Sequence, residues 1–328
     1  MKICVVGAGA IGGFLGTRLA ASGDEVSVIA IGETLDALRI HGWRLDTSDD
    51  RVTAPVRATD DPAQLGQQEL VIIALKGQVL PSAAPRLAPL IGPGTIVLPA
   101  MNGVPWWFNA TVPELADTSL ESVDPGGHIA AAIPVGHVLG CVVHASCASP
   151  EPGLVRHVMG QGLIVGEALG GTSTRATAVA RRLTRAGFDV TVSADIRQDI
   201  WYKLWGNLTM NPVSAITGAT IDHLLDDPFV REFCSAAMRE AAAIGARLRC
   251  TITQDPEDRH VVTGKLGAFR TSMLQDAETG RPLELDGIVG AVHEMGRRLE
   301  IPTPAIDALF GLTRLFGRER GLYPAASA

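Results

Sequence analysis

The sequence predicts an α/β domain followed by an all-α domain. Up to about residue 194, short apolar runs alternate with segments of helical periodicity, which is the order of a parallel α/β sheet. From residue 195 to residue 328, strand-like runs almost disappear and helical segments follow one another between prolines. A glycine-rich stretch, GAGAIG, stands directly between the first apolar run and the first helical segment. We therefore expect two domains, residues 1–194 and 195–328.

The expected strands of the first domain are apolar on both faces, as in the interior of a parallel sheet. They are KICVV, EVSVIA, LVIIALK and TIVLPAM, followed by VLGCVVHAS, GLIVGE and FDVTVSAD. The helices expected between them cover residues 11–22, 81–93 and 172–187. In the second domain, helices are expected at 196–211, 228–247, 256–279, 284–300 and 304–318, with a break near Gly267. Pro212 should kink or end the first of these, because proline lacks a backbone donor.

The composition limits the classes of partner. With 46% hydrophobic and 19% charged residues, a net charge of −7 and no run of Lys or Arg, the chain lacks the basic surface that nucleic acid requires. No apolar stretch reaches the ~18 residues of a membrane helix, and no signal segment precedes the first strand, so we expect a cytoplasmic protein and no membrane partner. The five cysteines are scattered without metal-ligand spacing, so we expect free thiols and no metal site.

The glycine-rich stretch has the spacing Gly7-x-Gly9-x-x-Gly12. In a Rossmann-type domain, the first glycine permits a tight turn, the second lets the backbone approach a pyrophosphate, and the third lets helix and strand pack closely. The amino terminus of the following helix favours negative charge. A plain turn without a ligand is the alternative, but the order strand, glycine loop, helix, strand favours a dinucleotide site.

The end of the second strand should show which dinucleotide binds. An acidic residue there binds the ribose hydroxyls of NAD, whereas a nearby arginine accommodates the 2′-phosphate of NADP. This chain has Ala30 and Ile31 at those positions, and Glu33 comes late. Arg39 and Arg44 lie further on, where a surface position is expected. The residues alone leave the choice between NAD and NADP open.

A polar stripe marks the helix expected after residue 195. Lys203, Asn207 and Asn211 are spaced by four, so they fall along one side of a helix whose remaining surface is rich in Trp and Leu. A solvated surface face is the alternative. However, that side carries no acid to pair with Lys203, and amides are unusual choices for solubility alone. Reduction of a ketone by hydride develops negative charge on oxygen, which a lysine can protonate while amides hold neighbouring oxygens.

At this point the sequence resembles the ketopantoate reductase (2-dehydropantoate 2-reductase) family over nearly its whole length. GAGAIG is similar to that family's cofactor loop, and KLWGNLTMNPVSAITG resembles its characteristic helix. The stretches ALKGQ, MNGV, TSMLQD and PLELDG also match family motifs, in family order. The resemblance implies reduction of ketopantoate, a keto acid, to pantoate with NADPH on the way to pantothenate and coenzyme A. It also implies a homodimer formed through the helical domain.

The resemblance assigns a role to each matching residue. Lys203 would donate the proton, and Glu284 would be the acid that completes the site. The residues implied to bind cofactor are Gly7, Gly9, Ala10, Ile11, Gly12, Lys76 and Asn102. Those implied to contact substrate are Asn102, Asn207, Asn211 and Ser272. Without the resemblance, Glu284 is an ordinary acid at the start of a helix, and Ser272 could be a helix cap.

One position departs from the family pattern. The family reads Ala-Arg-Gly at the end of the second strand, and its arginine meets the 2′-phosphate of NADP, but this chain reads Ala30-Ile31-Gly32. Losing this charge-assisted partner should weaken the preference for NADP, so we expect NADP with NAD also possible. Two other functions stay open: a related reductase acting on another 2-keto acid or keto ester, and a dinucleotide-binding sensor without turnover.

Overall fold

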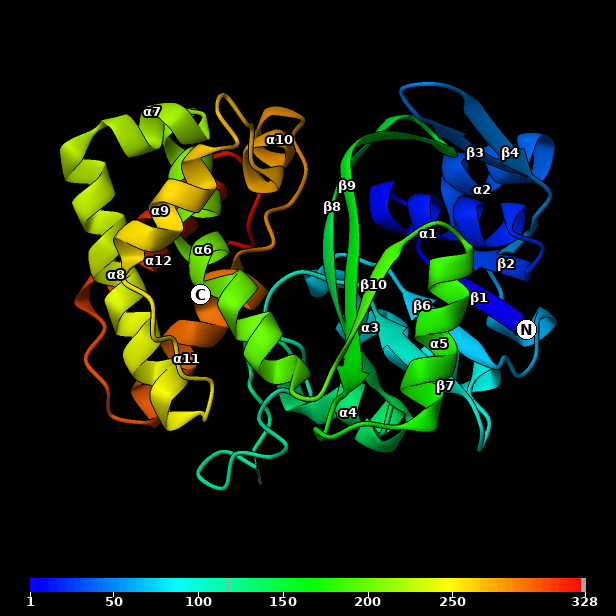
Figure 1. Ribbon diagram of the computed structural model, residues 1–328, viewed down its shortest axis with the longest axis horizontal. Coiled ribbons are helices and arrows are strands. Elements are labelled where there is room, and N and C mark those ends of the chain that lie inside the picture. Colours follow the sequence, from blue (N-terminus) through cyan, green and yellow to red (C-terminus); the bar gives the residue numbers. More distant parts are fainter. Residues whose placement is uncertain (117, 326–328) are drawn as a thin grey trace. The chain divides into compact units, whose positions relative to one another are not determined.

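The computed structural model describes residues 1–116 and 118–325 and divides into two compact units (Figure 1). The first unit, Met1–Met101 with Gly127–Asp199, contains two sheets and their helices, and the second, Asn102–Gly126 with Ile200–Ala328, is helical. This confirms the predicted fold class. The chain crosses between the units more than once, so a single boundary near residue 194 does not separate them.

The segment 102–126 lies in the helical unit although it precedes most of that unit in sequence. The backbone N–H groups of Glu121 and Ser122 donate to the carboxylate of Glu294, at 2.9 and 2.8 Å. Arg298 donates to the carbonyl of Ser119 at 2.7 Å. These are contacts between residues far apart in sequence, and the segment has no helical or strand periodicity that would announce them.

The first sheet has the strand order β5-β2-β1-β6-β7, and its strands are parallel. The strands are β1 (Lys2–Val6), β2 (Glu25–Ile29), β5 (Arg57–Thr59), β6 (Leu70–Ile73) and β7 (Ile96–Pro99). Every residue of β6 and β7 is buried, as their continuous apolar runs predict. All these strands therefore end at one edge of the sheet, where ligands bind in folds of this type.

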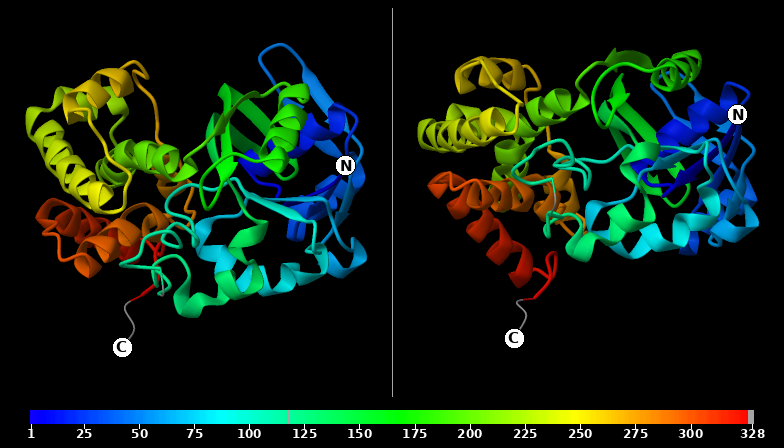
Figure 2. Two further views of the ribbon diagram at one scale, coloured as in Figure 1. Left: turned by 60° about the horizontal axis from the view of Figure 1, so that its bottom comes forward. Right: turned by 90° about the horizontal axis from the view of Figure 1, so that it is seen from below.

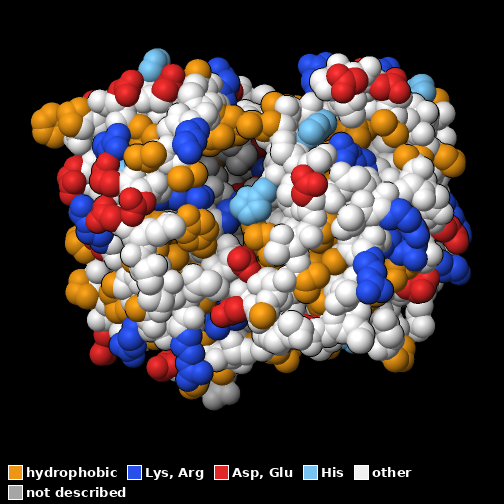
Figure 3. Space-filling view, in the orientation of Figure 1, with side chains coloured by type: hydrophobic (Ala, Val, Ile, Leu, Met, Phe, Trp, Pro, Cys, Tyr) orange, Lys and Arg blue, Asp and Glu red, His pale blue; other side chains and the backbone are white. Residues whose placement is uncertain are grey.

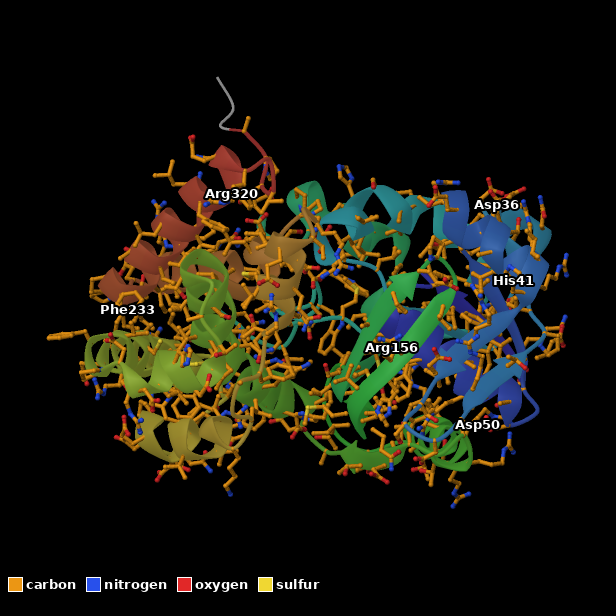
Figure 4. The ribbon with its side chains drawn as sticks, turned by 90° about the horizontal axis from the view of Figure 1, so that it is seen from above. Asp36, His41, Asp50, Arg156, Phe233 and Arg320 are labelled. Atoms are coloured by element: carbon orange, nitrogen blue, oxygen red, sulfur yellow. The ribbon has the colours of Figure 1, made fainter. Side chains whose placement is uncertain are left out.

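The second sheet has the order β10-β9-β3-β4, and β8 pairs antiparallel with β9. Its strands are β3 (Trp43–Asp46), β4 (Arg51–Ala54), β8 (Leu139–Glu151), β9 (Leu154–Glu167) and β10 (Asp189–Ser193). β8 and β9 form the long pair seen in Figure 1. β3, β4 and β5 were not predicted, since they are short and mix apolar with charged residues. Asp50, labelled in Figure 4, lies in the turn between β3 and β4.

Helix α1 (Ala10–Ala21) contacts strands of both sheets. A Cβ at Gly13 would lie 2.4 Å from the Val155 side chain of β9, and one at Gly16 would lie 2.5 Å from the ring of Trp43 in β3. The two glycines therefore allow α1 to pack directly on the second sheet, and α1 contributes Phe14, Leu15 and Leu19 to a buried apolar cluster of the unit.

None of the other helices of this unit in the described residues is longer than α1. They are α2 (Gly32–His41), α3 (Leu80–Ala83), α4 (His128–Ala132) and α5 (Thr174–Arg185), with 3-10 turns at 62–64, 77–79, 84–90, 125–127 and 135–137. Asp36 and His41 lie on α2 (Figure 4). The helix predicted at 81–93 is one α-helical turn followed by the 3-10 stretch Ala84–Leu90. Prolines at 81, 85 and 89 remove the donors that a continuous α-helix needs.

The second unit is built from helices joined by loops (Figure 2). They are α6 (Ile196–Thr217), α7 (Ile221–Asp226), α8 (Pro228–Arg247), α9 (Pro256–Gly264), α10 (Ser272–Glu278), the π-helix Asp286–Gly290, α11 (Ala291–Arg298) and α12 (Pro304–Glu319). The predicted break near Gly267 separates α9 from α10, and Gly267 has a φ of +60°. A buried cluster that includes Met210, Leu224 and Leu309 joins α6, α7 and α12.

The expected end of α6 at Pro212 is wrong, because the helix continues to Thr217. Pro212 and the residues Val213, Ser214 and Ala215 after it are buried. Burial of this last turn compensates for the hydrogen bond that proline cannot donate, so tertiary packing overrides the local preference.

Charged side chains are distributed over the surface. Figure 3 shows acidic and basic groups interspersed on one face, without a continuous basic patch. Among the helices of the described residues, none is both long enough and apolar enough to cross a membrane.

His260 of α9 links stability to pH. Its side chain is 2% exposed, and its Nε2 lies 2.9 Å from Oγ of Ser235 in α8. Burial lowers the pKa of this imidazole below its usual 6.5; Glu257 and Asp255 oppose the shift, and Arg231 adds to it. As pH falls below about 6.5, the unfolded chain takes up a proton before the folded one does, so stability should fall with a slope of up to about 1.4 kcal/mol per pH unit.

We expect His260→Gln to flatten this pH dependence. Denaturant unfolding at pH 7.5 and 5.5, followed by tryptophan fluorescence, measures it, since Trp201 and Trp205 lie in the same unit. His223→Gln is the matched control because His223 is exposed. Equal loss of stability at pH 5.5 in wild type and His260→Gln would contradict the expectation.

Candidate functional site

The glycine loop between β1 and α1 has the geometry that its spacing suggests. Gly7 has a φ of +93°, a conformation that side-chain-bearing residues rarely adopt, and a Cβ there would lie 2.8 Å from the carbonyl oxygen of Ala74. A Cβ at Gly12 would lie 1.9 Å from the carbonyl oxygen of Gly7. Around Gly9, in contrast, a Cβ would meet nothing within 4 Å. Gly7 and Gly12 thus have structural reasons to be glycine, whereas Gly9 opens toward free space.

Ala10 and Ile11 continue this loop into α1. Ala10 is the first residue of the helix, and Ile11 is partly buried against the core of the unit. The N–H of Gly13 donates to the carbonyl of Gly9 at 2.8 Å, which starts the helix directly at the loop. The first-turn N–H groups of α1 therefore begin where the glycine loop ends.

A pocket of about 220 Å³ opens beside the loop. It lies at the ends of β1, β2, β5 and β6, and its walls are mostly apolar. Its lining residues include Gly7, Gly9, Ala30, Ile31, Thr34, Asp60, Leu75, Val79, Arg86 and Leu87. An apolar pocket next to a glycine loop, at the carboxyl ends of parallel strands, suits an adenosine group with its pyrophosphate over the glycines. The residues of this unit therefore fit a dinucleotide.

Lys76 lies at the same edge of the first sheet. It follows β6 and caps the 3-10 turn Gly77–Val79 in an extended conformation, and its neighbours Leu75 and Val79 line the pocket. The structure thus places Lys76 in the chain segment between two residues that line the pocket beside the glycine loop.

In the helical unit, the structure brings two of the predicted site residues into direct contact. Nζ of Lys203 donates to Oδ1 of Asn102 at 3.0 Å. Lys203 is half-buried on α6, and Asn102 is half-buried in the loop after β7. Their contact spans 101 positions of sequence, so sequence spacing alone did not predict it.

Asn207 and Asn211 follow Lys203 along α6, one and two turns further on. Asn207 is half-buried, and Asn211 is 6% exposed. The helix is fixed on its apolar side, where the indole N–H of Trp205 donates to the carbonyl of Met238 at 2.7 Å. The polar stripe is therefore not a fully solvated surface face, because Lys203 and Asn207 are half-buried and Asn211 is buried.

The loop that carries Asn102 packs on the π-helix Asp286–Gly290. The N–H of Val104 donates to the carbonyl of Gly287 at 2.8 Å. Gly103 has a φ of +83°, and a Cβ there would lie 2.4 Å from the same carbonyl oxygen. Glu284 is half-buried three residues before Gly287, so the segment that carries the predicted acid lies against the segment that carries Asn102.

The chain segment near Tyr323, which the sequence did not point to, contacts this π-helix and the residues just before it. The hydroxyl of Tyr323 donates to Oδ1 of Asp286 at 2.5 Å, and the N–H of Leu283 donates to the carbonyl of Leu322 at 2.9 Å. Burial raises the pKa of the Asp286 carboxyl, while Tyr323 and Arg314 oppose the shift. In the sequence, Asp286 stands two residues after Glu284, and this proximity could have drawn attention to it. No local pattern points to Tyr323.

Ser272 lies on a different element from Lys203 and Asn102. It is the exposed first residue of α10, and the preceding Thr271 caps the helix by accepting from the N–H of Leu274 at 3.2 Å. The cap is thus Thr271 and not Ser272. Ser272 itself is exposed, so a ligand carboxylate can reach it.

Comparison with known proteins gives the family. Residues 3–170 match the model of ketopantoate reductase PanE/ApbA, and residues 195–316 match that of its C-terminal domain. The chain belongs to the ketopantoate reductase family.

Relatives of high coverage support this assignment. A 2-dehydropantoate 2-reductase from Mesorhizobium japonicum is 43% identical over 98% of this chain and 100% of its own length. A Ralstonia solanacearum structure assigned to the ketopantoate reductases is 54% identical, covers 98% of this chain and 99% of its own, and has a TM-score of 0.95. The protein is accordingly an oxidoreductase of the kind that interconverts a ketone and an alcohol.

Proteins with this fold include enzymes named for different substrates. A D-mandelate dehydrogenase solved with NADH and anilino(oxo)acetate has a TM-score of 0.83 over 98% of this chain and 100% of its own, at 22% identity. The fold of a ketopantoate reductase therefore does not by itself determine which ketone is reduced.

The close approach of Gly103 to Gly287 gives a prediction for this ketopantoate reductase family member. Gly103→Ala should cost about 1–2 kcal/mol for the positive φ alone, and its methyl group must displace Gly287. Because Asn102 is the neighbouring residue, we expect kcat to fall about tenfold to a hundredfold. Thermal unfolding and kcat should both be measured.

Gly311→Ala is the control, since a Cβ at this position of α12 would meet nothing within 4 Å. We expect it to keep wild-type kcat and to gain up to roughly 1 kcal/mol in the free energy of unfolding, because alanine is favoured over glycine inside a helix. A Gly103→Ala variant with wild-type kcat would show that the position of Asn102 does not depend on this contact.

Proposed function

We propose that this chain reduces 2-dehydropantoate to pantoate with a nicotinamide dinucleotide, and that Lys203 donates the proton. The observation that carries the proposal is the contact between Lys203 and Asn102 in a family of 2-dehydropantoate 2-reductases. The glycine loop and its pocket support the dinucleotide.

The chemistry that the bound cofactor supplies is a hydride for the C2 carbonyl of the keto acid. The ketone oxygen then becomes an alkoxide and needs one proton, so the products are the alcohol and the oxidised cofactor. In this proposal, the Lys203 ammonium supplies that proton and stabilises the negative charge as it develops. Asn102 accepts one of the three ammonium N–H bonds, which orients the group.

The remaining polar residues are proposed to bind the rest of the substrate. Asn207 and Asn211 would hold its hydroxyl end, and the exposed hydroxyl of Ser272 would hold its carboxylate. We propose that Glu284 completes the site, with its segment held to the Asn102 loop through Gly287.

The test is a turnover assay with purified protein and ketopantoate, in which NADPH and NADH are compared by the loss of cofactor absorbance. Rapid oxidation that depends on ketopantoate supports the proposal. Cofactor binding without turnover of any ketone would contradict it and favour a sensor.

A reductase of another 2-keto acid is the second candidate, favoured by the D-mandelate dehydrogenase that shares the fold. A panel of 2-keto acids and keto esters separates the two candidates, because turnover of another ketone but not of ketopantoate would support this one.

A homodimer is also part of our proposal. Light scattering of the purified protein measures its mass in solution and so tests it.

A further inference from the structure

The dinucleotide pocket contains a cation that the sequence did not reveal. Among the residues that line it, Arg86 and Asp60 carry charge, while Ala30 and Ile31 occupy the end of β2, where an acid or an arginine usually selects the cofactor. Arg86 lies in the 3-10 stretch Ala84–Leu90, more than 50 positions after Ile31 in the sequence.

The guanidinium of Arg86 is anchored one strand away from Ile31. Its Nη2 donates to the carbonyl of Asp60 at 3.2 Å. Asp60 follows β5, whose Thr59 pairs with Ile29 and accepts from the N–H of Ala30 at 3.1 Å. Neighbouring strands lie about 4.8 Å apart. The anchored guanidinium therefore lies near the end of β2, although it comes from a different part of the chain.

The anchor leaves the guanidinium able to bind an anion. A backbone carbonyl is neutral, so it orients the group without cancelling its charge, and it takes one of five N–H donors. The Arg86 side chain is exposed and lines the pocket. An arginine fork pairs well with phosphate oxygens, and such charge-assisted pairs are stronger than neutral ones.

The carboxylate of Asp60 is the competing determinant. An acid that binds the ribose hydroxyls of NAD stands at the end of the second strand, which is Ala30 and Ile31 in this protein. Asp60 belongs to the neighbouring strand end instead. The usual NAD-selecting position is thus apolar, whereas Arg86 supplies the positive charge that the usual NADP-selecting position lacks.

We propose that Arg86 binds the 2′-phosphate of NADPH and makes this protein prefer NADPH to NADH. The inference rests on the dinucleotide part of the proposed function and not on the identity of the ketone. It replaces the expectation that Ile31 alone opens the site to NAD.

Binding of cofactor fragments tests the proposal without any ketone. The affinities of 2′,5′-ADP and 5′-AMP are measured by calorimetry for the wild type and for Arg86→Ala. We expect Arg86→Ala to weaken 2′,5′-ADP about ten- to a hundredfold, the range for a lost charge-assisted hydrogen bond, and to leave 5′-AMP within about threefold. The proposal would be overturned if Arg86→Ala weakened the binding of both fragments equally, because Arg86 would then contact the part that they share. It would also be overturned if the binding of neither fragment changed, because Arg86 would then contact neither.

Arg39→Ala is the matched control. Arg39 is an exposed arginine of α2 whose Nε donates to the carbonyl of Ala58 at 3.3 Å, so it is anchored on β5, two residues before the anchor of Arg86, but does not line the pocket. It should bind both fragments as the wild type does. Ile31→Arg added to Arg86→Ala should restore 2′,5′-ADP binding if a cation near the end of β2 is what the phosphate requires, and failure to restore it would count against the proposal.

Two further outcomes are decisive. If Asp60→Asn weakens 5′-AMP and leaves 2′,5′-ADP unchanged, Asp60 binds the ribose hydroxyls and the pocket is an NAD site, which overturns the proposal. If the wild type binds neither fragment, the dinucleotide site itself is refuted. Fragment binding with no turnover of ketopantoate would instead refute the proposed substrate and leave the role of Arg86 intact.

Discussion

Replacing Lys203 with alanine is expected to lower kcat by about 10²- to 10⁴-fold, the usual contribution of a positioned general acid. The amino group is held at 3.0 Å from the amide oxygen of Asn102, so its position is set before the substrate arrives. Without it, the alkoxide that forms on hydride transfer must take its proton from water. Because the proposed substrate contacts of Asn207 and Asn211 remain in this variant, KM should change less than kcat.

Two further variants separate proton donation from charge. Lys203→Arg keeps a positive charge but does not release a proton near neutral pH, so its kcat should stay close to that of the alanine variant. Lys265→Ala should behave as the wild type, since Lys265 is an exposed lysine at the end of α9. Steady-state kinetics of the three variants with the keto acid measure these differences.

The assignment fails if Lys203→Ala keeps kcat within about tenfold of the wild type, or if Lys203→Arg is fully active. In the first case another group donates the proton. In the second, charge alone stabilises the transition state, and the role of Lys203 is electrostatic.

The parts of the fold that were predictable are those with a local cause. The apolar run of β1, the glycines after it and the period of α1 each follow from neighbouring residues, and the structure has the strand at Lys2–Val6 and the helix at Ala10–Ala21. Likewise α8 covers Pro228–Arg247, the span that proline and helical periodicity predicted. Pro212 is the exception, since burial of the following turn outweighs its local effect.

The predicted site residues divide in the same way. The spacing of Lys203, Asn207 and Asn211 is local to one helix, so their common stripe could be read from sequence. Three other contacts join residues far apart in the chain. Lys203 donates to Asn102, the Asn102 loop packs on Gly287, and Arg86 donates to the carbonyl of Asp60 beside the end of β2. Such contacts depend on the packing of whole elements and leave no periodic pattern.

The glycine loop should respond to mutation in two different ways, and Gly12→Ala is expected to have the larger effect on stability. In an ordinary helix, alanine would be favoured over glycine by roughly 1 kcal/mol. Here its Cβ would lie 1.9 Å from the carbonyl oxygen of Gly7 and 3.0 Å from Cβ of Ala74. The backbone must therefore move, and we expect a loss of at least about 3 kcal/mol in the free energy of unfolding, the upper end for overpacking.

Gly9→Ala is the informative partner of this variant. Because a Cβ at Gly9 would meet nothing within 4 Å, its stability should stay within about 0.5 kcal/mol of the wild type. The methyl group would instead occupy the space where a pyrophosphate approaches the loop, so NADPH affinity should fall at least about tenfold, or 1.4 kcal/mol. Denaturant unfolding and NADPH titration of both variants measure the two effects. If Gly9→Ala bound NADPH as the wild type does, the open space at this residue would not be the place of the pyrophosphate, and only the packing role of Gly12 would remain.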